Sequence, residues 1–268
     1  MNLSSAPIGI FDSGIGGLTV TKAVMELLPQ EDIIYFGDTA RVPYGIKSEE
    51  TVRNYALQIT RFLLEKNVKM ILIACNTVSA SAKNEIIELA GDIPVLDVIT
   101  AGARVATSLP QHKQVGVIGT LATVNSKAYE RAIHELEPDV EVVQQACPLL
   151  VPLAEEGWID NEVARQTLKT YLEFFDGNPI ESLILGCTHY PLFKEVIGQQ
   201  LSTQKVEIID SAESIALAAK SLLSDMQALN SKGGTLNCYV SDRPQRFEEL
   251  AQRFLGKPLS GIHIVELS

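Results

Sequence analysis

Two of the four cysteines stand in surroundings that favour chemistry. Cys75 and Cys187 each end a short apolar run, and small polar residues follow each of them at once. A thiol between the end of a strand and the start of a helix lies near the positive end of the helix dipole, which favours the reactive thiolate. All four cysteines are widely spaced and none forms a C-x-x-C pair, so we expect neither a structural zinc site nor a disulfide framework.

The polar residues beside these cysteines can bind an anion. Asn76 and Thr77 follow the first cysteine, and Thr188 and His189 follow the second. Backbone N–H groups and hydroxyls at the start of a helix hold a carboxylate without the help of lysine or arginine. His189 is also placed to assist Cys187 as an acid–base group, although a single histidine is more often structural.

Two further segments are candidates for the same site. The run 11–18 ends an apolar stretch in Asp-Ser and continues with glycines, which allow a tight turn. Asp12 is thus an acid at the end of an expected strand, where it could assist Cys75. The segment 37–45 contains glycine and proline and is typical of a ligand-binding loop. Neither segment matches a dinucleotide-binding or P-loop motif.

Paired cysteines suit a reaction whose substrate and product are mirror images. A racemase removes a proton from one face of Cα and delivers a proton to the other, and a thiolate opposite a thiol can do both. A cysteine hydrolase needs only one cysteine, with a histidine base and an oxyanion hole. The pattern therefore favours a cofactor-free amino-acid racemase in which Cys75 and Cys187 transfer the proton.

Alternating strands and helices must position these residues. We expect strands at 8–11, 32–36, 69–74, 95–98, 114–119, 140–144, 182–186 and 206–210. We expect helices at 16–28, 48–66, 79–89, 126–136, 160–175, 213–226 and 246–255. In the clearest helix, 48–66, apolar residues recur three and four positions apart. This alternation predicts an α/β fold with largely parallel sheets that are buried on both faces.

An internal repeat indicates two similar lobes. The segment 7–13 resembles 114–120, and the segment 69–77 resembles 181–189, in the same order and at similar offsets. Ligands bind at the carboxyl ends of parallel strands, so facing lobes would direct both cysteines into one cleft. Periodicity alone leaves open which lobe the residues after 208 join.

Charge and hydropathy restrict the partners. The 268 residues include 22 Lys and Arg against 33 Asp and Glu, a net charge of −11. Without a basic cluster, we expect neither nucleic acid nor a membrane surface as a partner. The first residues lack the pattern of a secretory signal, and the apolar runs are too short to span a bilayer. We therefore expect a soluble, cytoplasmic protein.

Six motifs together resemble the bacterial glutamate racemase family. They are DSGIGGL (12–18), PYG (43–45), ACNT (74–77), VGVIGT (115–120), CPLLVPLAEEG (147–157) and LGCTHYPL (185–192). Any one of them is a weak signal, but the six occur in order over nearly the whole chain. One departure is Val42, which stands where the family often has a cysteine before PYG.

The resemblance implies a fold and an activity. Two flavodoxin-like lobes would be related by a pseudo-two-fold axis, with the active site in the cleft between them. The C-terminal segment would return to the first lobe, giving lobes of 1–98 plus 209–268 and of 99–208. The implied activity is the interconversion of L-glutamate and D-glutamate without cofactor or metal, which supplies D-glutamate for peptidoglycan synthesis. A homodimer is the expected assembly.

Motif matching also implies the site residues. Cys75 and Cys187 are the implied acid–base thiols, with Asp12 and His189 as their assistants. The residues implied to contact the substrate are Asp12, Ser13, Tyr44, Gly45, Asn76, Thr77, Thr188 and His189.

The segment 147–157 contributes one further implied acid. It maps to Glu155, with the neighbouring Glu156 as the alternative. Cys147 opens the same segment, and we expect it to serve packing.

Two other functions fit parts of this pattern. An aspartate racemase, or a decarboxylase or isomerase of the same fold, could use similar cysteines, but Thr188 and His189 after the second cysteine favour glutamate. An amino-acid-binding protein could use the cleft without chemistry, yet binding alone does not require two thiols.

Overall fold

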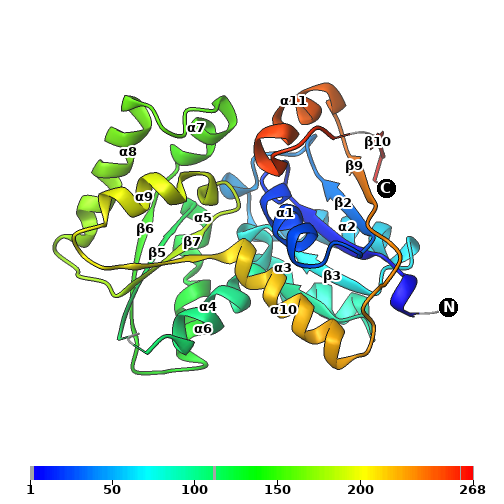
Figure 1. Cartoon of the computed structure of the whole chain (residues 1–268), viewed down its shortest axis with the longest axis horizontal. Coiled ribbons are helices and arrows are strands. Elements are labelled where there is room, and N and C mark those ends of the chain that lie inside the picture. Colours follow the sequence, from blue (N-terminus) through cyan, green and yellow to red (C-terminus); the bar gives the residue numbers. More distant parts are fainter. Residues whose placement is uncertain (1–2, 111–112, 260, 268) are drawn as a thin grey trace.

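Two parallel β-sheets organise the structure, a computed structural model that describes residues 3–110, 113–259 and 261–267 (Figure 1). Sheet A contains β1 (Ile8–Asp12), β2 (Ile33–Gly37), β3 (Met70–Ile73), β4 (Val95–Asp97), β9 (Leu236–Val240) and β10 (Ile262–Ile264). Sheet B contains β5 (Gln114–Gly119), β6 (Glu141–Ala146), β7 (Ser182–Gly186) and β8 (Glu207–Asp210). Every strand pairing recorded in the described residues is parallel, which confirms the predicted α/β class.

Helices cover both faces of each sheet. They are α1 (Leu18–Leu27), α2 (Glu49–Glu65), α3 (Asn76–Ala90), α4 (Val98–Ser108), α5 (Leu121–Ser126), α6 (Ala128–His134), α7 (Leu150–Glu156), α8 (Glu162–Leu172), α9 (Lys194–Gln200), α10 (Ser211–Asp225) and α11 (Pro244–Leu255). On sheet A, α1, α10 and α11 pack on one face and α2 and α3 on the other. On sheet B, α7, α8 and α9 pack on one face and α4 and α6 on the other.

Alternation along the strands builds these cores. Ile8 and Ile10 of β1 join the apolar cluster under α1, whereas Phe11 joins the cluster under α2 and α3. Successive side chains of a strand point to opposite faces, so a strand between two helical layers must be apolar on both. This requirement explains the nearly continuous apolar runs in the sequence.

The strand orders reveal the repeat in space. Sheet A contains the order β2-β1-β3-β4, and sheet B has the corresponding order β6-β5-β7-β8. The first matched pair of sequence segments falls on β1 and β5, and the second falls on β3 and β7. The prediction of two similar parallel-sheet lobes is therefore confirmed.

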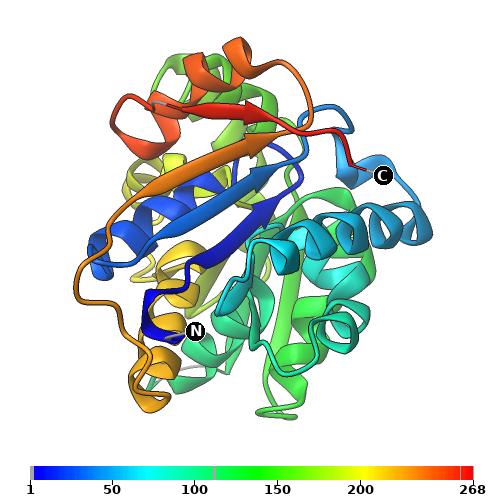
Figure 2. The same ribbon diagram turned by 90° about the vertical axis from the view of Figure 1, so that its right-hand side faces the viewer.

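The C-terminal segment extends sheet A. β9 pairs with β2, and β10 pairs with β9, so both strands lie beyond the repeated unit (Figure 2). The exact lobe boundaries, 1–98 plus 209–268 and 99–208, stay a prediction, because α4 and α10 each contact strands of both sheets. Within the described residues, no helix is long and apolar enough to cross a membrane.

Several element boundaries differ from expectation by one or more residues. The strand predicted at 95–98 ends one residue earlier, because the Asp97 carboxylate accepts N–H groups of Ile99 and Thr100 and starts α4. The helix predicted from 79 begins already at Asn76. Asn76 and Thr77 therefore lie in the first turn of α3, directly after Cys75.

Candidate active site

A cavity of about 290 Å³ lies between the lobes, beyond the carboxyl ends of the strands. Cys75 reaches it from the end of β3, and Cys187 reaches it from the end of β7 in the other sheet. Other predicted residues lining it are Ser13, Tyr44, Gly45, Asn76, Thr77, Glu155, Thr188 and His189. Asp12, also predicted to contact the substrate, is 1% exposed and is not among the residues that line the cavity. The structure thus brings together residues that are far apart in the chain.

The first cysteine lies beside an acid. Sγ of Cys75 is 3.6 Å from the Ser13 hydroxyl. Burial, together with the negative charge of Asp12, raises the pKa of Cys75 to about 12. The surroundings therefore keep this sulfur as a neutral thiol at neutral pH when Asp12 is ionised.

Asp12 has one oxygen free for proton exchange. Its Oδ2 accepts the Gly14 N–H at 3.0 Å, whereas its Oδ1 has no hydrogen-bond partner among the described residues. Burial raises the pKa of Asp12, although the charge of His189 and nearby backbone N–H groups oppose the rise. A buried carboxyl group with an unpaired oxygen and a raised pKa can act as a proton acceptor or donor.

The second cysteine lies beside a base. Sγ of Cys187 is 3.9 Å from Nδ1 of His189, and Nε2 of His189 is 3.2 Å from Oε1 of Glu155. Burial lowers the pKa of His189, but its hydrogen bonds to Cys187 and Glu155 outweigh burial and raise the pKa to about 10. The two sulfurs therefore have opposite electrostatic surroundings.

The structure also separates the two neighbouring acids of α7. Glu155 reaches His189, and this hydrogen bond lowers the pKa of Glu155. Glu156 instead points to Arg246, with its Oε1 3.4 Å from Nη2 of the arginine. Of the two acids, Glu155 is the one in contact with the histidine.

Polar groups at the start of α3 are available to an anion. Oδ1 of Asn76 accepts the Tyr129 hydroxyl at 2.8 Å, which fixes the orientation of the amide. Its Nδ2 donor is buried without a hydrogen-bond partner among the described residues. This donor and the first turn of α3 can hold a carboxylate, since the end of a helix presents unpaired N–H groups.

A buried acid that the sequence analysis did not single out orders the loop after β2. Asp38 accepts the Tyr44 hydroxyl and, at 2.6 Å, the Nε–H of Arg41. Its other oxygen accepts the Ser241 hydroxyl at 2.7 Å. The Tyr44 hydroxyl is therefore bonded to the loop itself. The sequence signal that could have identified Asp38 is the Gly37-Asp38 pair, which follows an apolar run.

The glycine-rich turn after β1 fits closely against the other lobe. A Cβ on Gly16 would lie 2.2 Å from Oγ1 of Thr188 and 2.5 Å from Nδ1 of His189. The Thr19 hydroxyl donates to the Thr188 carbonyl at 2.9 Å across the same contact. The missing side chain at Gly16 allows the two lobes to meet around the second cysteine.

Some residues of the cavity wall were not predicted. They are Thr120, Leu121, Pro148, Val151, Pro152, Val42 and Ile46, together with Gly14 and Ile15 of the glycine turn. Thr120 could have been found from the repeat, because it occupies the position that matches Ser13. The mainly apolar members carry no chemical signal in the sequence.

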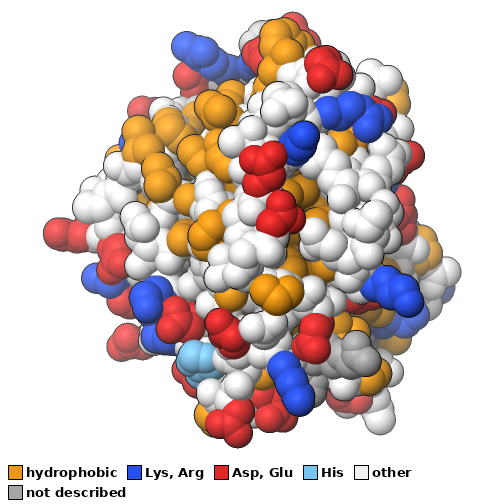
Figure 3. Space-filling model, turned by 90° about the vertical axis from the view of Figure 1, so that its left-hand side faces the viewer, with side chains coloured by type: hydrophobic (Ala, Val, Ile, Leu, Met, Phe, Trp, Pro, Cys, Tyr) orange, Lys and Arg blue, Asp and Glu red, His pale blue; other side chains and the backbone are white. Residues whose placement is uncertain are grey.

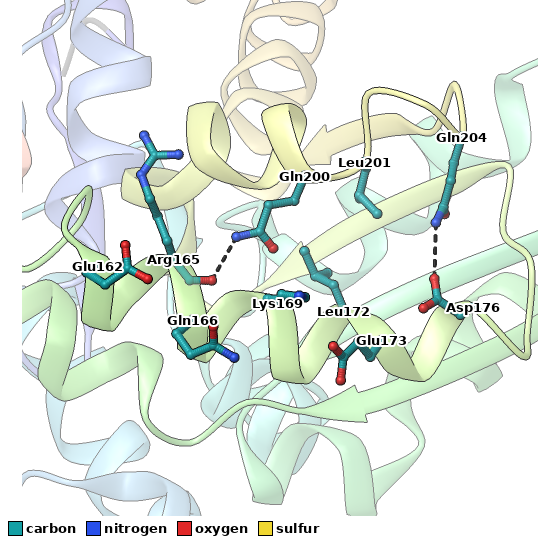
Figure 4. Close-up of a pocket in the computed structure, with 10 residues that line it drawn as sticks. All are labelled: Glu162, Arg165, Gln166, Lys169, Leu172, Glu173, Asp176, Gln200, Leu201 and Gln204. Carbon is teal, nitrogen blue, oxygen red and sulfur yellow. Dashed lines mark hydrogen bonds between the residues drawn. The ribbon is translucent and has the colours of Figure 1, made fainter.

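A larger hollow on the second lobe has a different character. It encloses about 470 Å³ between α8 and α9 (Figure 4). Its polar side chains bond within the groove: Gln200 donates to the Arg165 carbonyl at 2.8 Å, and Gln204 donates to Asp176 at 3.3 Å. The ten lining residues include none of the predicted site residues, so we place the candidate site in the smaller cavity.

Across 3–110, 113–259 and 261–267, no three His, Cys, Asp or Glu side chains group in a way that could hold a metal ion. The expectation of a reaction without metal or cofactor stays a prediction. All four cysteines are free thiols, and Cys147 is buried in the core of the second lobe.

Comparison with known proteins assigns the family. The family model for Asp/Glu/Hydantoin racemase matches residues 8–219. Glutamate racemase from Syntrophus aciditrophicus is 50% identical over 263 residues, which cover 97% of each chain. Glutamate racemase from Neisseria meningitidis is 49% identical over 263 residues, with the same coverage.

Solved structures agree with this match. The crystal structure of glutamate racemase from Francisella tularensis in complex with D-glutamate has a TM-score of 0.92 and 45% identity over 98% of each chain. The enzyme from Thermus thermophilus, in complex with beta-chloro-D-alanine, has a TM-score of 0.89 and 43% identity over 98% of each chain. The chain therefore belongs to the Asp/Glu/Hydantoin racemase family, and it is a racemase, an enzyme of the isomerase class.

Proposed function

We propose that the protein interconverts L-glutamate and D-glutamate by proton transfer between two cysteines, without a cofactor. The observation that carries this proposal is that Cys75 and Cys187 line one cavity from opposite lobes. The choice of glutamate is supported by relatives named glutamate racemase and by a similar structure that binds D-glutamate.

The proton moves between two faces of the substrate. The thiolate of one cysteine takes the Cα proton, and the electron pair of the broken C–H bond delocalises into the adjacent carboxylate. The thiol of the other cysteine then gives its proton to the opposite face of Cα. The product is the mirror image of the substrate, and the two sulfurs have exchanged protonation states.

The neighbouring acid–base groups restore the starting state. Asp12 exchanges a proton with the Cys75 side, and His189 exchanges one with the Cys187 side, where Glu155 supports the imidazole. One direction starts from a thiolate at Cys187 and a thiol at Cys75. The reverse direction starts from the opposite arrangement.

The anionic substrate requires local positive potential in a chain of net charge −11. Protonated His189 supplies a positive charge at the cavity wall. The Asn76 amide, the Thr77 N–H group and the Thr188 hydroxyl are the proposed donors to the glutamate carboxylates, and Ser13, Tyr44 and Gly45 complete the proposed contacts. The helix dipole of α3 adds to this potential.

The cellular role and the assembly are further proposals. We infer that the product supplies peptidoglycan synthesis in the cytoplasm, and that the chain forms a homodimer without a nucleic-acid or membrane partner. Figure 3 shows hydrophobic side chains gathered on the upper part of the second lobe, with basic side chains scattered among acidic ones. Leu149, Trp158 and Val163 are about half exposed in this lobe, which supports a contact between copies.

Replacing each cysteine tests the proposed function. We expect Cys75→Ser and Cys187→Ser each to reduce racemisation of either glutamate enantiomer at least about 1,000-fold, since each removes one of two required acid–base groups. Optical rotation follows the reaction. The control is Cys238→Ser, which changes a buried cysteine that does not line the cavity. Full activity in either variant contradicts the proposal, and parallel assays with L-aspartate and L-alanine test the alternative substrates.

A further inference from the structure

The C-terminal helix of the first lobe contacts the second lobe next to the site. α11 lies across the lobe boundary from α7, at the top of Figure 1. Arg246 of α11 pairs with Glu156 of α7, and Arg253 of α11 donates to carbonyl oxygens at the end of α7. These contacts connect the end of the chain to the helix that carries Glu155.

Arg253 caps the last turn of α7. Its Nη1 donates to the Ala154 carbonyl at 3.4 Å and, more closely, to the Glu155 carbonyl. Carbonyl groups in the last turn of a helix lack intrahelical partners, and a positive charge there also stabilises the helix dipole. The guanidinium therefore holds the backbone of the residue whose side chain reaches His189.

Gly157 makes room for this cap. It is the C-cap of α7 and adopts a left-handed conformation, with φ of +78°. A Cβ at this position would lie 2.7 Å from both Cζ and Nη2 of Arg253. The missing side chain thus serves two purposes, since it permits the positive φ and lets the guanidinium approach the helix end.

The adjacent residue of α11 contacts the histidine. The ring of Phe254 packs edge-to-face on His189, with centroids 5.2 Å apart and an interplanar angle of 84°. Consecutive residues of α11 therefore hold both members of one pair: Arg253 holds Glu155 through its backbone, and Phe254 holds the imidazole ring. The Glu155–His189 hydrogen bond of 3.2 Å lies between these two contacts.

We propose that Arg253 is a positioning residue of the racemase, which keeps Glu155 within hydrogen-bond distance of His189 and so links the C-terminal helix to proton transfer at Cys187. This inference rests on the proposed two-cysteine function. Arg253 acts through Glu155 and is not proposed to touch the substrate.

The charged groups around His189 determine what the loss of Arg253 would change. The imidazole of His189 interacts with the charges of Cys187, Glu155 and Asp12. Arg246 of α11 in turn interacts with the charge of Glu155. Burial lowers the pKa of His189, whereas Cys187 and Glu155 raise it to about 10. If Glu155 moves away, the pKa of His189 falls, and the basic limb of the kcat/KM profile moves to lower pH.

The test compares Arg253→Met with Glu155→Gln. We expect R253M to lower kcat about 10- to 100-fold, the usual cost of misplacing a catalytic group. Both variants should shift the basic limb of the pH profile in the same direction. The double variant should be no slower than E155Q, because both changes disrupt one hydrogen bond. R253K, which retains the positive charge, should recover part of kcat.

Controls separate positioning from general damage. Arg165→Met makes the same chemical change on α8, and we expect its kcat and pH profile to match those of the starting protein. If R253M does not fold, as judged by thermal melting, R253K and Arg253→Gln provide the same comparison with E155Q. An unchanged kcat and pH profile, or losses that multiply fully in the double variant, overturn the inference. The proposed function fails instead if the unsubstituted protein does not racemise glutamate, so the two failures are distinguishable.

Discussion

The two cysteines are equivalent in the fold but not in their surroundings. Cys75 lies beside a buried acid, which raises its pKa, whereas Cys187 lies beside a protonated histidine. A reaction with mirror-image substrates can use this asymmetry, because a neutral thiol and a thiolate are the two states that it needs at once. In the proposed mechanism, each sulfur therefore has a different assistant, Asp12 beside Cys75 and His189 beside Cys187.

Sequence reasoning found most of the side chains that define this asymmetry. Cys75 and Cys187 were recognisable because they follow buried strands, and His189 because it stands two residues after Cys187. The choice between Glu155 and Glu156 needed coordinates, because adjacent residues of a helix point about 100° apart and either could have faced the cavity. Asp38 was missed because its role depends on Tyr44 and Arg41 folding back to it within the loop.

The raised pKa of His189 predicts a pH-dependent contribution to stability. The pKa is about 10 in the folded protein, against an ordinary value of 6.5, so protonation favours folding. This contribution is complete below pH 6.5 and is lost as the pH rises through 10. We therefore expect His189→Gln to lower the free energy of unfolding at pH 6, with a smaller difference at pH 9.5.

Urea denaturation of both proteins at the two pH values measures this difference. His134→Gln is the control, because His134 is bonded to the Val140 carbonyl away from the cavity. A difference between H189Q and the unsubstituted protein that stays constant or grows from pH 6 to 9.5 would contradict the assigned charge of His189.

At the scale of elements, turns after strands bring the two lobes together. The turn 13–17 fits against Thr188 and His189 only because Gly16 lacks a side chain. We expect Gly16→Ala to reduce kcat/KM at least about 100-fold, because the displaced turn moves groups on both sides of the cavity. Thermal melting should also show a lower Tm, since a Cβ only 2.2 Å from Oγ1 of Thr188 forces the neighbouring atoms to shift.

Gly177→Ala is a matched control for this substitution. No described atom lies within 4 Å of the position that a Cβ would take there. We expect its kcat/KM and Tm to stay close to those of the unsubstituted protein. Equal behaviour of the two alanine variants would show that the close lobe contact at Gly16 is not required.

Strands and helices could be predicted from the sequence where burial requires a pattern of apolar residues. The apolar runs predicted the strands of the repeated unit, since those strands are covered on both faces. β9 contains the exposed Asn237 and β10 has only three residues, so neither has a continuous apolar run. The sequence analysis missed α5, α7 and α9, which have only six or seven residues each, and α4, which starts directly after a strand.

At the scale of the whole molecule, duplication explains the position of the site. Each repeated unit ends a central strand in a cysteine, and the units face each other across one cavity. The C-terminal segment then adds β9, β10 and α11 to one unit only, which breaks the symmetry. Through Arg253 and Phe254, this added part reaches the acid–base pair of the opposite lobe. Periodicity could not predict this return, because the segment has no counterpart in the repeat.

The isotopic content of early product tests the central claim most directly. L-Glutamate is incubated with the protein in deuterated water, and both enantiomers are separated at low conversion and analysed by mass spectrometry. Two cysteines on opposite faces predict D-glutamate that carries deuterium at Cα, while the remaining L-glutamate stays largely protiated. D-Glutamate that retains the original Cα protium would show that a single group returns the proton it removed, and would contradict the account.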